Sequence, residues 1–176
     1  MPPTRPSSSR RAPLRGRGFS LVELIAVIVI LGTLSAVAIG SMSALAATRA
    51  QAAANQLARD LGFLRQHAMG TGKSCWANFT VASSRYWFLM DTATPGYASA
   101  APLADPATGN AFDVRFNQDP YAGVTISSAS GTSFGFDHLG RPVDTTGSER
   151  ASSVVVSLSS GRSVTVQPRT GLAQAN

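Results

Sequence analysis

The feature that most constrains this chain is an apolar segment, Phe19 to Ile39, whose only charged residue is Glu23. Its twenty-one residues would span about 31 Å as a helix, which matches the roughly 30 Å hydrocarbon core of a bilayer. An ionisable side chain at the centre of a bilayer costs roughly 2.5–3.5 kcal/mol on insertion scales. The segment therefore predicts a membrane-spanning helix, and Glu23 is a functional hypothesis that needs a partner.

Basic residues are concentrated ahead of this segment. Five arginines lie within residues 1–18: Arg5, Arg10, Arg11, Arg15 and Arg17. The net charge is +6, but outside the leader only ten basic and nine acidic side chains remain. Positive charge before an apolar helix orients that end toward the cytoplasm. Residues 1–18 are thus expected to be a basic leader that takes no part in the fold.

The chain stays helical after the apolar segment but becomes amphipathic over residues 41–70. Leu57, Leu61, Leu64 and Ala68 recur at helical spacing and form one stripe. The polar residues Arg59, Asp60, Arg65 and Gln66 fall outside that stripe.

Glycines mark the two places where this helix is expected to change. Gly70 and Gly72 predict its end. Residues 19–40 and 41–70 are expected to form one helix of about fifty residues, ~75 Å long. Gly40 is the expected bend, because glycine lowers helix stability.

Residues 71–176 switch to the period-two pattern and composition of strands. The expected strands are Trp76–Val81, Arg85–Met90, Phe112–Phe116, Val124–Ser127, Ser133–Asp137, Ser153–Leu158 and Ser163–Gln167. A long loop, Thr92 to Gly109, interrupts the series. No strand–helix alternation is present, so the expected class is α+β, with an antiparallel β domain packed on the amphipathic stripe.

The stretch Arg17-Gly18-Phe19-Ser20-Leu21-Val22-Glu23-Leu24-Ile25 resembles the prepilin-peptidase signal of type IV pilins and type II secretion pseudopilins. The resemblance implies cleavage between Gly18 and Phe19 and N-methylation of Phe19. It also implies an assembly role for Glu23, whose carboxylate would meet the N-terminal amine of a neighbouring subunit. A first-turn carboxylate is independently favoured by the helix dipole.

The β-rich remainder is similar to the GspH/FimT family of minor pseudopilins and minor pilins. Two segments carry this weaker resemblance: Phe134 to Pro142, and Val164 to Gly171. Many members have proline at the position of Gly40. The resemblance implies a pilin-like structural subunit of a secretion pseudopilus and not an enzyme. Its partners would be prepilin peptidase, other pseudopilins or pilins in a filament, and lipid of the bacterial inner membrane. The N-terminus would be cytoplasmic and the β domain periplasmic.

Two alternatives remain at this stage. One is a minor pilin of a type IV pilus that contacts DNA through surface arginines, namely Arg141, Arg150, Arg162 and Arg169. These arginines interleave with acidic residues, which argues against a nucleic-acid partner. The other is a soluble periplasmic domain released at Ala44-Leu45-Ala46, an A-x-A site. Glu23 would interrupt the apolar region of such a signal peptide.

Other chemical signals are weak. Gly131-Thr132-Ser133-Phe134-Gly135 fits the G-x-S-x-G pattern, but a hydrolase elbow needs a following helix, and the sequence predicts a strand. Cys75 is the only cysteine and is expected in a strand. Asp105, Asn110 and Asp113 do not have the spacing of a calcium loop. We expect no catalytic residue, metal site or cofactor.

Overall fold

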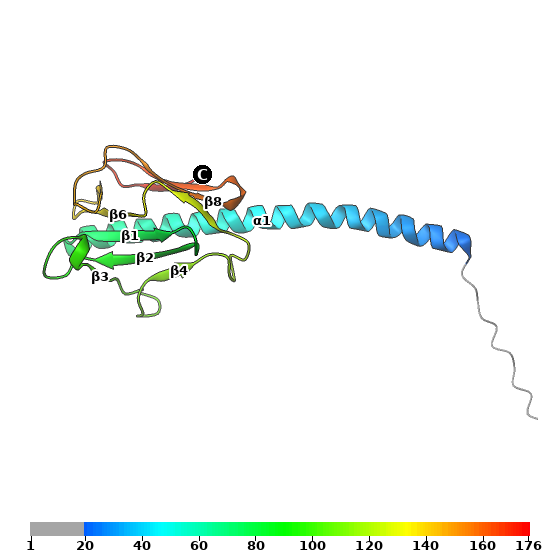
Figure 1. The fold of residues 1–176 in the computed structure, drawn as a ribbon, viewed down its shortest axis with the longest axis horizontal. Coiled ribbons are helices and arrows are strands. Elements are labelled where there is room, and N and C mark those ends of the chain that lie inside the picture. Colours follow the sequence, from blue (N-terminus) through cyan, green and yellow to red (C-terminus); the bar gives the residue numbers. More distant parts are fainter. Residues whose placement is uncertain (1–19) are drawn as a thin grey trace, which may run out of the picture. The chain divides into compact units, whose positions relative to one another are not determined.

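The computed structural model describes residues 20–176, except for the side chains of residues 36–43. Gly18 and Phe19, at the predicted cleavage site, lie outside the described residues. The chain divides into two compact units, Met1–Ser41 and Met42–Asn176. The 51-residue helix α1, Leu21–Thr71, has residues in both units (Figure 1). Gly40 is assigned to this helix, and the bend predicted there stays a prediction.

Helix α1 ends where the glycines predicted it would. Gly72 follows the last helical residue with φ +68°, the left-handed conformation that commonly closes a helix and that glycine adopts without strain.

The second unit contains two antiparallel sheets. The first has the order β3-β2-β1-β6-β7, with β4 also paired to β2, and the second has the order β10-β9-β8-β5. In Figure 1 strands of both sheets lie alongside the C-terminal part of α1. The strand bounds are β1 Cys75–Thr80, β2 Arg85–Met90, β3 Ala101–Pro102, β4 Asp113–Arg115, β5 Ile126–Ala129, β6 Ser133–Phe136, β7 Pro142–Val143, β8 Val154–Leu158, β9 Ser163–Val166 and β10 Ala173–Ala175.

Each of the seven predicted strands overlaps an observed one, and three observed strands were missed. Strands β3 and β7 have two residues each and contain proline, so they carry no period-two pattern. Strand β10 is Ala-Gln-Ala, a composition with low strand propensity, and it forms by pairing with β9. Short 3₁₀ turns occur at Tyr97–Ser99 and Ser159–Gly161.

The amphipathic stripe is the helical side of one continuous core. Leu57, Leu61 and Leu64 are fully buried together with aromatic side chains of β2 and β6, among them Phe88 and Phe134. Full burial of a leucine contributes about 1.5–3 kcal/mol. This confirms that an antiparallel β domain packs on the stripe.

Asp60 lies outside the stripe in sequence, yet it is also buried, with 8% of its surface exposed. Its Oδ2 accepts a hydrogen bond of 2.6 Å from the Tyr86 hydroxyl on β2, and its Oδ1 accepts one of 2.8 Å from the Gln56 amide. Burial raises the pKa of Asp60, and these two hydrogen bonds partly oppose the rise. Both oxygens of Asp60 therefore accept hydrogen bonds, and the contact with Tyr86 joins α1 to the first sheet.

Two turns meet the helix at Arg65. The Arg65 Nε donates to the carbonyl oxygen of Gly140 at 3.1 Å. Gly171, in the turn between β9 and β10, has φ +65°, and a Cβ added there would lie 2.2 Å from that same Gly140 oxygen. Glycine is required at 171 for both reasons. The turn after β6 and the turn after β9, distant in sequence, are thereby fixed against α1.

The first prediction concerns the buried carboxylate. Tyr86→Phe should lower the free energy of unfolding by about 1–3 kcal/mol, because Asp60 loses a buried hydrogen bond while remaining desolvated. Denaturant unfolding of the full chain in detergent, followed by tryptophan fluorescence, measures this change. Tyr121→Phe is the matched control, since Tyr121 lies at the edge of the core and its hydroxyl has no hydrogen-bond partner in residues 20–176. Equal effects of the two substitutions would show that the Asp60 contact contributes nothing.

The second prediction separates the cost of backbone strain at a glycine position from the cost of steric crowding there. Gly161 and Gly171 both have positive φ, but only Gly171 faces crowding atoms. Gly161→Ala should cost about 1–2 kcal/mol from left-handed strain alone. Gly171→Ala should cost about 1–3 kcal/mol more through overpacking against Gly140. The same unfolding experiment tests both, and similar losses would contradict the proposed close contact.

Candidate functional site

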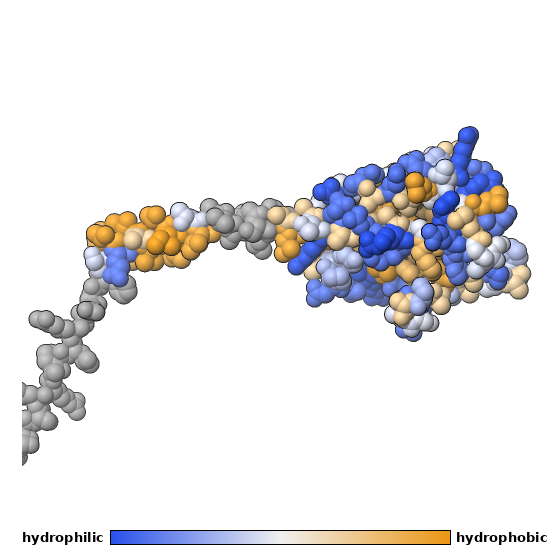
Figure 2. Space-filling model, turned by 180° about the vertical axis from the view of Figure 1, so that it is seen from behind, coloured by the Kyte–Doolittle hydropathy of each residue, from blue (hydrophilic) through white to orange (hydrophobic). Residues whose placement is uncertain are grey.

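The N-terminal part of α1 presents an uncovered apolar surface. Ten large apolar side chains between Leu21 and Leu34 are 44–73% exposed: Leu21, Val22, Leu24, Ile25, Val27, Ile28, Val29, Ile30, Leu31 and Leu34. Figure 2 shows this segment coloured almost entirely as hydrophobic. A helix that is apolar on every side needs a cover, either lipid or other helices.

The few polar side chains of this segment do not break its apolar character. Thr33 Oγ1 donates to the Ile30 carbonyl at 2.9 Å, and Ser35 Oγ donates to the Leu31 carbonyl at 2.7 Å. Both hydroxyl protons are thus bound within the helix, as an apolar environment requires. No helix among the described residues contains a stretch that is long and apolar enough to span a membrane. The span predicted for Phe19 to Ile39 stays a prediction.

Glu23 is the exception in this apolar surface. It lies exposed in the first turn of α1, where the partial positive charge of the helix N-terminus favours a carboxylate. Within residues 20–176 its carboxylate has no hydrogen-bond or ion-pair partner. Its predicted partner, the amine of Phe19, belongs to a residue that the structure does not describe. Within residues 20–176, the site therefore consists of a carboxylate that has no partner, at one end of an apolar surface that no other described residue covers.

Ser133, in the G-x-S-x-G pattern, belongs to a hydrogen-bond network within the β domain. Its hydroxyl donates to Asn78 Oδ1 at 2.6 Å, and the Tyr97 hydroxyl donates to the same oxygen at 2.6 Å. It begins strand β6, and no helix follows it. His138 is exposed on the adjacent turn. These residues do not converge into a nucleophile and base.

The Tyr97 contact shows where the long loop Thr92 to Gly109 lies. Cys75 and Phe79 of β1 belong to the core cluster, so the alternating Trp76 and Asn78 occupy the opposite face of the first sheet. Tyr97 reaches Asn78 and contacts the ring of Trp76 edge-on, 5.6 Å between centroids. The first part of the loop therefore covers the outer face of the sheet. No sequence pattern indicated this position of the loop.

Arginines that were considered for DNA contact are partly engaged within the chain. Arg141 pairs with Asp137 at 2.7 Å, and Arg150 donates to the Ser130 carbonyl at 3.1 Å. Burial raises the pKa of Asp137, but hydrogen bonds from the Arg141 backbone and side chain and from the Leu139 N–H outweigh it, so the pKa is lowered.

Asp105 in the long loop and Asp113 in β4 form hydrogen bonds and an ion pair that stabilise the fold. Asp105 accepts hydrogen bonds from Ala107 N at 2.9 Å and Thr108 Oγ1 at 3.0 Å, and Asp113 holds Arg85 at 2.7 Å. Within residues 20–176, no three His, Cys, Asp or Glu residues gather as a metal site. Cys75 is buried in β1, as predicted; burial, and secondarily the Asp91 charge, raise its pKa to about 12.

No known family model matches the sequence, and no curated protein matches it. Solved structures do match. The minor pseudopilin EpsH from the type 2 secretion system of Vibrio cholerae is 14% identical, over 73% of this chain and 96% of that chain, with a TM-score of 0.54. A second crystal structure of EpsH gives 13% identity, 73% and 93% coverage and a TM-score of 0.52. The type IV minor pilin FimU of Pseudomonas aeruginosa gives 15% identity, 72% and 91% coverage and a TM-score of 0.48.

These likenesses concern the fold. The helix packed on antiparallel sheets is the arrangement that this chain shares with EpsH, and the α+β prediction is confirmed. The two segments of weaker family resemblance, Phe134 to Pro142 and Val164 to Gly171, contribute the two glycines that meet at Arg65. The chain has the pilin-like fold of the GspH type.

Proposed function

We propose that this chain is a minor pseudopilin, a structural subunit of the pseudopilus of a type II secretion system. It would be made as a precursor in the inner membrane, with residues 1–18 in the cytoplasm. Prepilin peptidase would cleave between Gly18 and Phe19, and Phe19 would be N-methylated. The β domain would lie in the periplasm. The pilin-like fold and the signal-like sequence around Gly18 support this proposal.

The observation that carries the proposal is the uncovered apolar surface of α1 with Glu23 in its first turn. Lipid would cover that surface before assembly, and equivalent helices of neighbouring subunits would cover it in a filament. Burial of Glu23 needs a positive charge nearby. Cleavage after Gly18 would create one, the amine of Phe19, on each subunit. Pairing with a neighbour's amine would offset the burial cost and fix the axial position of one helix on the next.

The alternative is a minor pilin of a type IV pilus. It shares the processing, the apolar helix and the Glu23 contact, and differs in the filament that the chain enters. Purification of the tagged chain from cells decides between the two. Recovery with secretion pseudopilins supports the proposal, and recovery with pilus subunits supports the alternative.

The third prediction concerns Glu23. Glu23→Ala should abolish recovery of the chain in sheared or detergent-extracted filaments, because its helix would enter without the charge pair that sets its position. The measurement is the ratio of filament-bound to membrane-bound chain. The amount of processed chain in the membrane should stay unchanged. Ser35→Ala is the control on the same helix, since its hydroxyl only contacts its own helix. Normal incorporation of Glu23→Ala would refute the assembly role.

The fourth prediction concerns processing. Intact-mass analysis of the membrane-extracted chain should find a protein that begins at Phe19 and carries one added methyl group. Loss of residues 1–18 also removes five positive charges, so the isoelectric point should fall. A chain that begins near Ala47 would instead establish signal-peptide cleavage and a soluble product.

A further inference from the structure

Asp91 is a buried carboxylate outside the proposed assembly site. It directly follows β2 and is 6% exposed. Its Oδ1 accepts hydrogen bonds from the Trp76 indole Nε1 at 3.1 Å and from the Gly96 N–H at 3.0 Å. Its Oδ2 accepts no hydrogen bond from residues 20–176. This oxygen is not fully buried, in contrast to the Asn78 amide nitrogen, which is buried without a partner in that part of the chain. In that part of the chain, no basic nitrogen lies within 4.0 Å of the carboxylate.

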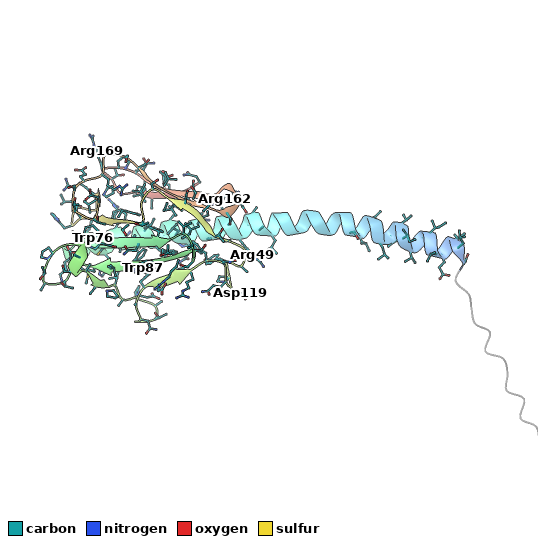
Figure 3. The ribbon with its side chains drawn as sticks, viewed as in Figure 1. Arg49, Trp76, Trp87, Asp119, Arg162 and Arg169 are labelled. Atoms are coloured by element: carbon teal, nitrogen blue, oxygen red, sulfur yellow. The ribbon has the colours of Figure 1, made fainter. Side chains whose placement is uncertain are left out.

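A cavity of about 260 Å³ lies against this carboxylate. Ser74 and Trp76, at the start of β1, form one wall, and Pro95 with Gly96 forms another. The turn Thr145–Gly147, which follows β7, closes the far side. Asp91 is the only charged residue that lines the cavity. Figure 3 labels Trp76 and also Trp87, which lies on the neighbouring strand β2 and does not line this cavity.

A buried charge is normally paired or bound to a metal ion, because its desolvation is otherwise uncompensated. Within residues 20–176, Asp91 has two hydrogen-bond donors but no counter-charge, and both donors bind the same oxygen. The cavity therefore has the electrostatics of a cation site. Ser74, Thr145 and Thr146 are the other hydroxyl-bearing residues that line it.

The shape of the cavity favours a cation on an alkyl stem over a bare metal ion. Calcium takes six to eight oxygen ligands, usually from several carboxylates, and only one carboxylate is present. The volume exceeds that of several water molecules, at about 30 Å³ each. The indole of Trp76 and the ring of Pro95 provide apolar walls for methylene groups.

We propose that this cavity is a recognition pocket for a lysine or arginine side chain of a neighbouring protein subunit, with Asp91 as its counter-charge. The identity of the partner as a filament subunit rests on the proposed function, whereas binding of the basic side chain does not. Lys73, the only lysine of the chain, is exposed beside Ser74, and it is the competing occupant.

The test uses the two indole N–H resonances of the ¹⁵N-labelled full chain in detergent. N-acetyl-lysine methylamide is titrated as the probe, and N-acetyl-norleucine methylamide is the uncharged control with a similar stem. The Trp76 indole signal should shift with saturation under the lysine probe only, because Trp76 donates to Asp91. The Trp87 signal should not move. Asp91→Asn, which keeps an acceptor oxygen but removes the charge, should weaken binding about tenfold or more.

Controls make each outcome decisive. Asp113→Asn removes a carboxylate from the partly exposed Arg85 pair and should leave the affinity unchanged. The proposal is overturned if the lysine probe gives no saturable shift, or if calcium chloride alone shifts Trp76. It is also overturned if binding occurs only in Lys73→Gln, because the pocket would then belong to the chain's own lysine. The titration needs no filament, so failure of the assembly proposal would not alter it.

Discussion

The structure depends on how the apolar surface of helix α1 is covered along its length. Along residues 50–68 of α1 the apolar stripe is sealed by the chain's own sheets, and its leucines are fully buried. Between Leu21 and Leu34 the apolar side chains surround the helix, and nothing in the described residues covers them. The first surface can stabilise a folded domain without help. The second is stable only when lipid or other helices cover it.

Most of the fold could be predicted because its information is local. Helical spacing of leucines, the terminal glycines and period-two strands each act over a few residues, and the structure confirms the amphipathic helix and seven strands. What sequence missed depends on pairing between distant segments. Strand β10 exists because β9 lies beside it, and Asp60 is buried because Tyr86, 26 residues later, offers a hydroxyl. Helical spacing placed Asp60 outside the apolar stripe, yet tertiary packing buries it.

The two proposed sites differ in the same way, because one is a local sequence motif and the other is assembled from distant segments. Gly18, Phe19 and Glu23 lie within six consecutive residues, so one short motif was sufficient to predict them. The Asp91 pocket is assembled from the end of β2, the start of β1, the loop after Asp91 and the turn after β7. No short pattern joins Ser74 to Thr146. An aspartate after a strand reads as an ordinary turn residue, and only the three-dimensional arrangement shows that it is buried beside a cavity.

Three carboxylates differ in how many hydrogen-bond donors the described chain supplies to them. Asp60 is satisfied by Tyr86 and Gln56, and its role is to fix the helix to the sheet. Asp91 is half satisfied, since one oxygen is held by Trp76 and Gly96 and the other has no donor in the described chain. Glu23 has no partner in the described chain and lies amid apolar surface. Because desolvating an unpaired charge is unfavourable, the burial of each group requires donors, and the described chain supplies them to both oxygens only for Asp60. For Asp91 and Glu23, the missing positive charge is what a neighbouring subunit would bring, through a basic side chain in one case and an N-terminal amine in the other.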